Sequence, residues 1–429
     1  MASDLAFIPA ALSPAARRHI RVFQIHQFLD RFAMGLTVSI VALALADRGM
    51  DLFQISLLFG VYALTTLTLE LPFGGLADSV GRKPVFLAAV VASVASVLLF
   101  LPTREFGVLA LSFACIGLGR ALRSGTLDAW FVETFRATAP GVDVQPALAR
   151  AHAANALGLA TGAVTGGLLP DVFGAAALER GFSPYDLSYA ASLVVMLGVF
   201  AYTRVAIVEP PRPRNPRALM QGVAAAPRVI AEASRLALRD PALALLLAAM
   251  GCFLMATNPV EVLWPTHVKP MLEVATANTV IGALTACYFF AIALGARLSP
   301  RVSRLFRRQH ARTLGGVFAG LAVVQVALAW QGGVAGFAAL FLIYSVLLGM
   351  AETPASSLLH ARVADRHRST LLSLRSLIQQ LGAALGLLLA GLLAEASSTP
   401  VAWSLGAAAL GLAAGLAFVL AGRLATGPH

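Results

Sequence analysis

Charged side chains inside long apolar runs are the residues of this sequence best suited to do chemistry. Asp30 interrupts the run 22–46, and Arg120 and Arg123 interrupt the run 106–131. A charge inside a membrane span costs at least about 2.5–3.5 kcal/mol, so each one needs a partner. By helical rise, Asp30 lies roughly 13 Å, and the arginines roughly 12–16 Å, from the run ends that adjoin basic loops. We therefore expect Asp30 to pair with Arg120 or Arg123.

Two roles are open for this pair. A nearby arginine keeps a carboxylate ionised, whereas separation of the pair in a buried place lets the carboxylate take up a proton. Asp30 would then carry a coupling proton. The alternative is a permanent ion pair that anchors the first half of the chain. Arg31 points to a different helix face, and we expect it to reach the interface or to pair with Glu70.

The second half of the chain carries its own buried polar groups. Glu352 and Arg375 lie at similar depths, about 10 Å by helical rise, in the tenth and eleventh apolar runs. They could form a lock or a simple pair, or they could shape a pocket with Gln379 and Gln380. The sequence leaves these alternatives open.

The remaining reactive groups do not form an enzyme site. Glu261 lies between Pro259 and Pro265 at the outer end of a run, where an outer gate could bend. The three cysteines lie inside apolar runs, and their odd number indicates no disulfide framework. No nucleotide-binding glycine loop, hydrolase motif or metal-ligand cluster occurs in the sequence. We expect no enzyme activity, no cofactor and no metal.

The composition requires a lipid environment. Of 429 residues, 58% are hydrophobic and 12% are charged, whereas a soluble domain carries about 25% charged residues. Lipid offers no partners for backbone groups, so the spans must be helical. We expect an all-α membrane protein with twelve transmembrane helices near 22–46, 52–74, 84–102, 106–131, 148–170, 186–206, 241–265, 275–297, 313–330, 334–358, 369–394 and 400–422.

The basic residues predict the orientation. The net charge is +11, but most of the 32 Lys and Arg residues fall in short loops that share one side, so nucleic acid is not the expected partner. The positive-inside rule then places both termini in the cytoplasm. No cleavable secretory signal precedes the first run. We expect a multi-pass, monomeric protein of the inner (plasma) membrane.

The chain is expected to form two six-helix bundles, 1–207 and 241–429, joined by a cytoplasmic linker at 208–240. Apolar residues of the linker recur at helical spacing from Leu219 to Ala233, opposite an arginine-bearing face. This pattern predicts an amphipathic helix on the inner leaflet, and a flexible solvated linker is the alternative.

The two halves also resemble each other in sequence. One shift in numbering aligns the glycines of the fifth and eleventh runs and places Gly125 on Gly349 and Asp128 on Glu352. Pseudo-symmetric repeats of this kind imply a central cavity that opens alternately to each side of the membrane.

The turn between the second and third runs reads Gly74-Gly-Leu-Ala-Asp-Ser-Val-Gly-Arg-Lys83. It resembles the signature loop of the major facilitator superfamily of secondary transporters, with Ser79 in place of the usual basic residue. The positions that match this signature are Gly74, Leu76, Ala77, Asp78, Gly81, Arg82 and Lys83.

This resemblance implies a gate. Asp128, near the inner end of the fourth run, should bridge to Arg82, and Asp78 should lie near the start of the eleventh run. Together they would lock the outward-open state. By the same resemblance, Arg120 corresponds to an arginine linked to proton coupling, although its spacing to Gly125 is one residue longer than usual. The loop from Arg297 to Arg312 lacks the acidic residue of the signature.

The fifth run contains Gly158, Gly162, Gly166 and Gly167. Their spacing resembles the antiporter motif of the same family, with Ala163 where the motif has proline. Small residues at this spacing let helices approach closely, either to seal two halves together or simply to pack.

We expect a secondary transporter that exports small amphipathic or hydrophobic molecules in exchange for protons. Proton-coupled uptake of a metabolite is one alternative, and a sensor or assembly partner that moves nothing is another. The expected partners are a small-molecule substrate, protons and the lipid bilayer.

Overall fold

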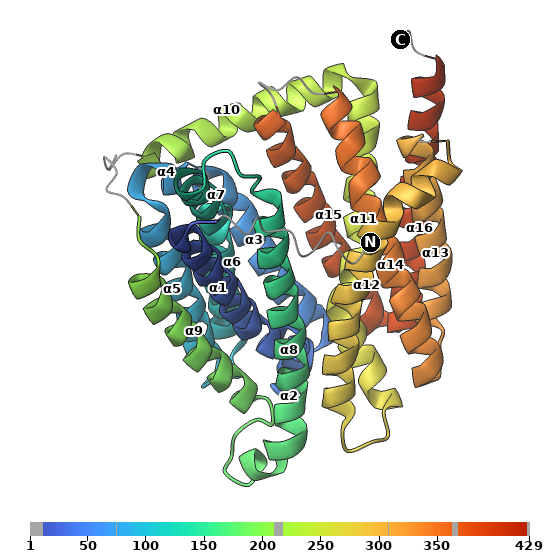
Figure 1. Cartoon of the computed structure of the whole chain (residues 1–429). Coiled ribbons are helices and arrows are strands. Elements are labelled where there is room, and N and C mark those ends of the chain that lie inside the picture. Colours follow the sequence, from blue (N-terminus) through green and yellow to red (C-terminus); the bar gives the residue numbers. More distant parts are fainter. Residues whose placement is uncertain (1–11, 74, 210–217, 308, 363–367, 427–429) are drawn as a thin grey trace. The chain divides into compact units, whose positions relative to one another are not determined.

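The computed structural model describes residues 12–73, 75–209, 218–307, 309–362 and 368–426. These residues form helices joined by short turns, and no strand occurs among them (Figure 1). Twelve of the helical segments described are long and apolar enough to cross a membrane. An all-α fold with twelve candidate spans is therefore confirmed.

The helices follow the expected runs, but α1 begins eight residues earlier than expected, and α8 and α12 each end eight residues later. Their bounds are α1 Pro14–Val38, α2 Val41–Asp47, α3 Leu52–Phe73, α4 Leu76–Val80, α5 Arg82–Phe100, α6 Phe106–Arg123, α7 Thr126–Thr138, α8 Gln145–Leu178, α9 Asp186–Ala206, α10 Ala218–Arg239, α11 Pro241–Val268, the 3₁₀ turn η1 Lys269–Met271, α12 Ala277–Leu305, α13 His310–Ala329, α14 Val334–Arg362, α15 Arg368–Ala396 and α16 Thr399–Thr426.

Two expected spans contain a break. The first divides into α1 and α2, and the fourth divides into α6 and α7 at Gly125. Gly125 has a φ of 67°, a left-handed conformation that ends one helix and resets the direction of the next. The break changes which side chains of the fourth span face their neighbours.

Local capping explains where several helices begin. The Asp51 carboxylate accepts from the backbone N–H of Gln54 at 2.7 Å, and the Gln54 side chain accepts from the N–H of Asp51 at 3.1 Å. This reciprocal capping box satisfies two backbone donors before α3. Asp240 caps α11 in a similar way, accepting from the N–H groups of Ala242 and Leu243.

The Asp240 carboxylate also accepts two hydrogen bonds from Arg362, each at 3.1 Å. Burial acts to raise the pKa of Asp240, but the bonds from Arg362 and from the Ala242 N–H outweigh burial and lower the pKa below its ordinary value. The start of α11 is thus tied to the end of α14 by a charged pair.

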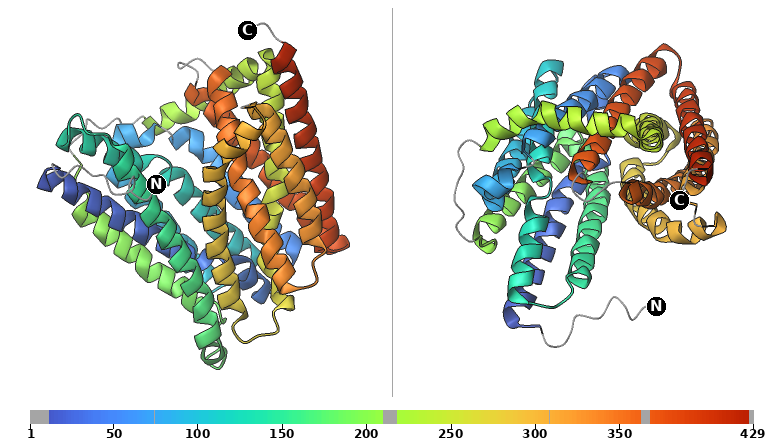
Figure 2. Two further views of the ribbon diagram at one scale, coloured as in Figure 1. Left: turned by 45° about the vertical axis from the view of Figure 1, so that its right-hand side comes forward. Right: turned by 90° about the horizontal axis from the view of Figure 1, so that it is seen from above.

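The chain divides into two compact units, each described here by itself. The first comprises 1–41, 68–223 and 278–286. In it α1 runs beside α8 and α9 (Figure 2), and α5 packs against α6 and α9. Stacked rings of Phe23 and Phe131, 4.4 Å apart, fill the contact between α1 and α7.

The second unit comprises 42–67, 224–277 and 287–429. Here α11 packs against α14, α15 and α16, and α13 packs against α14 and α16. The fully buried Gln325 of α13 connects four of these helices: its amide donates to the carbonyls of Ala256 on α11 and Trp403 on α16, and its oxygen accepts from the Tyr344 hydroxyl of α14 at 3.0 Å. The division into 1–207, 208–240 and 241–429 stays a prediction.

Candidate functional site

A buried charge cluster joins α1 to the end of α6 in the first unit. The Asp30 carboxylate lies 3.3 Å from Arg123 Nη2 and 4.0 Å from Arg31 Nε. The Asp30 side chain is only 7% exposed, so the pair is largely withdrawn from solvent. The Arg123 guanidinium also lies 5.6 Å from the centre of the Phe86 ring, a cation–π distance.

Of the two arginines expected beside Asp30, the structure pairs Arg123 with it. Arg120 is exposed and contributes no ion pair to Asp30 among the residues described. The ion pair described for Arg31 is with Asp30, the preceding residue of α1, rather than with Glu70. Roles in proton coupling for Asp30, Arg120, Arg123 and Glu70 remain predictions.

The preceding turn of α1 extends this cluster. The Gln27 amide donates to the Asp128 carboxylate at 3.1 Å and accepts from Asn155 at 3.3 Å. His26 Nε2 lies 3.1 Å from the Thr203 hydroxyl, and its buried Nδ1 has no hydrogen-bond partner in the described part of the chain. The sequence interpretation missed His26 and Gln27, although they precede Asp30 by four and three residues and so share its helix face.

The signature turn between α3 and α5 contains the short helix α4 and ends at Gly81, whose φ is 110°. Arg82, at the start of α5, is buried, and its guanidinium binds Glu133 at 2.6 Å and Asp78 at 3.3 Å. The guanidinium therefore connects the turn to α7. Gly74 of the signature lies outside the described residues.

In this structure Arg82 binds Glu133 and Asp128 binds Gln27, and the bridge from Arg82 to Asp128 in an outward-open state stays a prediction. The physical reason for the observed pairing is the break at Gly125. Because α7 starts afresh after this left-handed residue, Asp128 lies in its first turn facing α1, and Glu133, five residues later, faces the signature turn.

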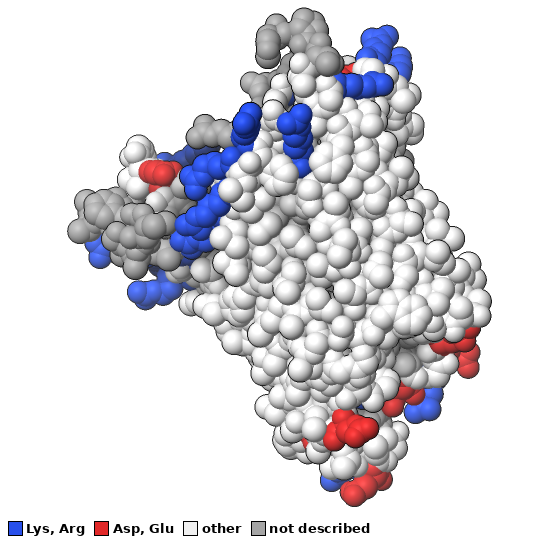
Figure 3. Space-filling view, turned by 90° about the vertical axis from the view of Figure 1, so that its right-hand side faces the viewer, with Lys and Arg blue, Asp and Glu red and all other residues white. Residues whose placement is uncertain are grey.

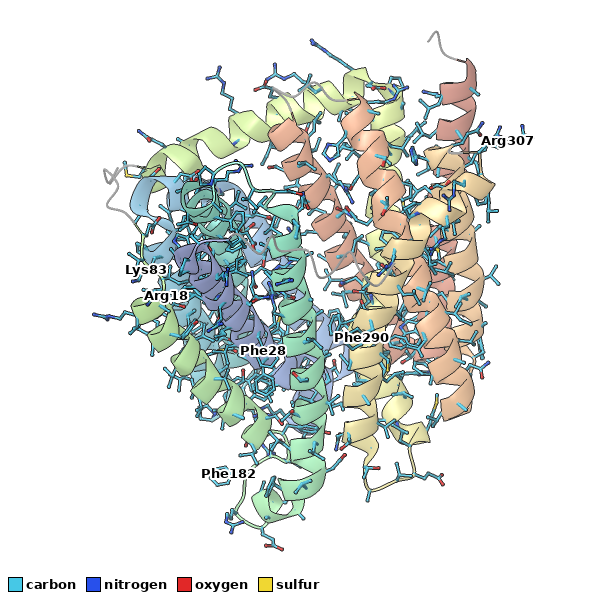
Figure 4. All side chains as sticks on the ribbon, in the orientation of Figure 1. Arg18, Phe28, Lys83, Phe182, Phe290 and Arg307 are labelled. Carbon is cyan, nitrogen blue, oxygen red and sulfur yellow. The ribbon has the colours of Figure 1, made fainter. Side chains whose placement is uncertain are left out.

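A second pair of contacts fastens the signature turn to the segment after α9. The Glu209 carboxylate accepts from the backbone N–H groups of Arg82 and Lys83, each at 2.9 Å, and so caps α5 from a distant part of the chain. In return, Lys83 (labelled in Figure 4) donates through Nζ to the carbonyls of Arg204 and Ile207, each at 2.7 Å. The negative Glu209 carboxylate lies at the N-terminus of α5, and the positive Lys83 ammonium lies at the C-terminal end of α9. Each charge is the one that the helix dipole favours at that end.

The antiporter-like glycines of α8 lie against the backbone of α1. A Cβ added at Gly162 would stand 2.5 Å from the Phe32 carbonyl oxygen, closer than real side chains allow. Gly158 and Gly166 meet the carbonyls of Phe28 and Leu36 in the same way, one turn below and one turn above (Phe28 is labelled in Figure 4). The spacing of the motif thus matches a close helix contact.

Gly167 faces the start of α12 rather than α1. There Asp171, one turn further along α8, accepts from the backbone and side chain of Asn278 and from the backbone and hydroxyl of Thr279 at 2.7–3.3 Å. Its carboxylate therefore caps the first turn of α12. Within the first unit, α8 contacts α1 through one set of glycines and α12 through Gly167 and Asp171.

In the second unit, Arg375 Nη2 lies 2.5 Å from the Glu352 carboxylate, and Nη1 donates to Ser356 at 3.1 Å. Arg375 is buried, whereas Glu352 is largely exposed. The two residues thus form a pair. Whether that pair is a lock or borders a pocket with Gln379 is still a prediction.

Twelve candidate spans, some of which carry ion pairs, define a multi-span membrane protein. The Major Facilitator Superfamily model matches residues 25–275 and 262–428, so the chain belongs to this family. No curated protein matches it significantly.

Solved structures of several transporters have the same fold. A nucleoside transporter, NupG, superposes with a TM-score of 0.72 at 12% identity, over 95% of this chain and 98% of its own. A bacterial homologue of the lysosomal transporter Spinster gives 0.73 at 15% identity, over 96% and 97%. A bacterial homologue of the iron transporter ferroportin gives 0.73 at 16% identity, over 95% and 99%. At these identities the likeness concerns the fold.

Proposed function

We propose that this protein is a proton-coupled exporter of small amphipathic or hydrophobic molecules that works by alternating access. The observation that carries the proposal is the buried Asp30–Arg123 pair on two candidate spans. An ionisable pair inside a membrane is costly, and such groups commonly form proton or substrate pathways.

The surroundings of Asp30 suit a reversible proton site. Arg123 holds the carboxylate in its charged form while the pair is closed. Movement of Arg123 away from Asp30 would leave a buried carboxylate without its closest cation, and protonation would then relieve the cost. His26 and Gln27 on the same helix face offer further polar groups beside this position.

The direction of transport is proposed from the resemblance of the glycines in α8 to the antiporter motif. Their packing on α1 supports a helix contact that must stay tight while other parts move. Gly166 packs against α1, whereas Gly167 packs against α12.

The distribution of charge supports a cytoplasmic location for the arginine-rich end. On the face shown in Figure 3, Lys and Arg gather toward one end, Asp and Glu lie mostly toward the other, and a broad region between them has neither. This arrangement is typical of a protein that spans a bilayer with its basic loops inside.

Flux into and out of proteoliposomes tests the proposal. Purified protein is reconstituted, a pH gradient is imposed, and movement of a panel of amphipathic compounds is followed with and without a protonophore. We expect gradient-driven flux that the protonophore abolishes. Absence of flux for every compound would favour a sensor or assembly partner, and substrate movement in the same direction as protons would favour uptake.

A further inference from the structure

Glu261, on α11 in the second unit, has no basic partner among the residues that the structure describes. The ion pairs described in this unit join Arg362 to Asp240 and Arg375 to Glu352. Yet Glu261 lies within the candidate span Pro241–Met271. A charged carboxylate without a cation is expensive at such a position, so the Glu261 carboxyl either takes up a proton or is matched by a positive charge from a ligand.

Two tyrosines lie near Glu261 and play different parts. The Tyr288 hydroxyl of α12 donates a hydrogen bond to the Glu261 carboxylate, and Tyr344 of α14 is the second tyrosine near it. The Tyr344 hydroxyl gives its single proton to Gln325, at 3.0 Å. Its oxygen therefore offers lone pairs to any further partner. Two oxygen acceptors, the carboxylate and this phenol, suit a cation.

One turn before Glu261, on the same face of α11, lies Thr257. Thr257 is fully buried, and its hydroxyl oxygen has no hydrogen-bond partner in the described part of the chain. Buried hydroxyls are nearly always bonded, so an unpartnered one beside an uncompensated carboxyl indicates a place that a ligand or water completes.

Aromatic rings form the wall behind these groups. Tyr288 stacks on Phe341 with ring centres 5.6 Å apart, and Trp264 lies 4.7 Å from the same phenylalanine. Phe341 and Trp264 are buried, while Glu261 and Tyr288 stay half-buried. The large apolar side chains exposed on the described surface include none from α11, so the accessible side of Glu261 is not part of an apolar strip facing lipid. Ring faces attract cations, with gains of about 0.5–2 kcal/mol.

We propose that Glu261, Tyr288 and Tyr344, backed by Phe341 and Trp264, bind the positively charged centre of a lipophilic organic cation. This inference rests on the proposed transport function and names the substrate class. The Asp30 cluster is unsuited to the same task, because two guanidinium groups already lie beside its carboxylate.

Equilibrium binding of tetraphenylphosphonium to the full-length protein in detergent tests this inference. Calorimetry should detect binding to the wild type, and Glu261→Gln should weaken it by at least about tenfold, which corresponds to about 1.4 kcal/mol. Glu261→Asp, which keeps the charge, should weaken it less. Tyr288→Phe keeps the ring, and its affinity for tetraphenylphosphonium should lie between those of the wild type and Glu261→Gln. Binding of uncharged triphenylphosphine oxide should not change.

The matched control is Glu395→Gln, which removes an exposed carboxylate from the same unit and should leave binding of the cation unchanged. Every variant is first checked for a single size-exclusion peak and a wild-type melting temperature. Equal binding by folded wild type and Glu261→Gln would overturn the inference, as would a folded wild type that binds neither tetraphenylphosphonium nor ethidium. Cation binding is measured without a gradient and so does not depend on proton exchange. If the protein binds the cation but shows no proton-driven flux, the proposed exchange is overturned and the binding site is not.

Discussion

The carboxylate of Asp30 lies between two guanidinium groups, and this position governs its response to protons. Arg123 is the closer of the two and belongs to another helix, so its distance can change when the helices move. Arg31 is the next residue in the chain and must stay nearby. A change in protonation would therefore depend mainly on Arg123.

Asp30→Asn removes the proton-binding group but keeps a hydrogen-bonding side chain of the same size. We expect proton-driven flux to be lost while expression and membrane insertion stay normal. Asp30→Glu, with the carboxyl retained, should keep part of the flux. Gradient-driven flux of Asp30→Asn equal to wild type would remove Asp30 from the coupling mechanism.

Arg82 forms an ion pair with Glu133 and not with Asp128. Glu133→Gln should loosen the signature turn by about 1 kcal/mol or less, because Glu133 is half exposed and its pair is partly screened. We expect a lower melting temperature in detergent and an altered transport rate.

Asp128→Asn is the matched control, since the asparagine oxygen can still accept from Gln27. It should leave the signature turn intact. A larger effect of Asp128→Asn than of Glu133→Gln on cysteine accessibility in the turn, measured with a reporter cysteine at Ser79, would contradict the pairing seen here.

At the scale of elements, the contact between α1 and α8 depends on the absence of side chains. Gly158, Gly162 and Gly166 each face a carbonyl of α1, so a methyl group added at any of them must push the helices apart. Overpacking of this kind costs about 1–3 kcal/mol.

Gly162→Ala should therefore lower the melting temperature and reduce transport. Gly198→Ala on α9 is the control, because a Cβ there would meet nothing within 4 Å. We expect Gly198→Ala to match or exceed wild-type stability, since alanine favours helix more than glycine does. Equal melting temperatures for the two variants would argue against a tight contact.

The start of α11 offers a test that depends on pH. The lowered pKa of Asp240 means that its carboxylate stabilises the fold at neutral pH, and that this contribution is lost as the pH falls through the lowered value, below the ordinary 3.8. Asp240→Ala should cost about 1 kcal/mol at neutral pH through loss of the cap.

Asp240→Asn keeps a capping oxygen and should cost less. Melting temperatures in detergent at pH 7 and at a series of acid pH values down to about 2.5 measure both effects. The acid-induced drop should be smaller in Asp240→Ala than in wild type. An identical drop in both proteins would assign the acid sensitivity to other groups.

At the scale of the whole molecule, twelve candidate spans and an excess of basic loops on one side predict that both termini face the cytoplasm. Reporter fusions at each end, active only in the cytoplasm or only outside it, check this orientation. We expect both fusions to report the cytoplasm. Termini on opposite sides would require an odd number of spans and would contradict the proposed topology.

Hydropathy alone predicted the helical fold and the twelve spans, because burial in lipid depends on local composition, and the signature turn from Gly74 to Lys83 indicated the family. Depth along two helices also predicted that Asp30 would meet an arginine of the fourth span. The glycine spacing in α8 indicated a close helix contact before the partner helix was known.

The tertiary structure alone decided which groups pair across long separations. Arg82 pairs with Glu133, and Asp128 with Gln27, because one left-handed residue, Gly125, resets the helix after it. Glu209 came to cap α5, more than a hundred residues earlier in the chain, through packing that no local pattern encodes. Spacing within a helix follows from its period, whereas the partner of a side chain depends on how separate helices rotate against each other.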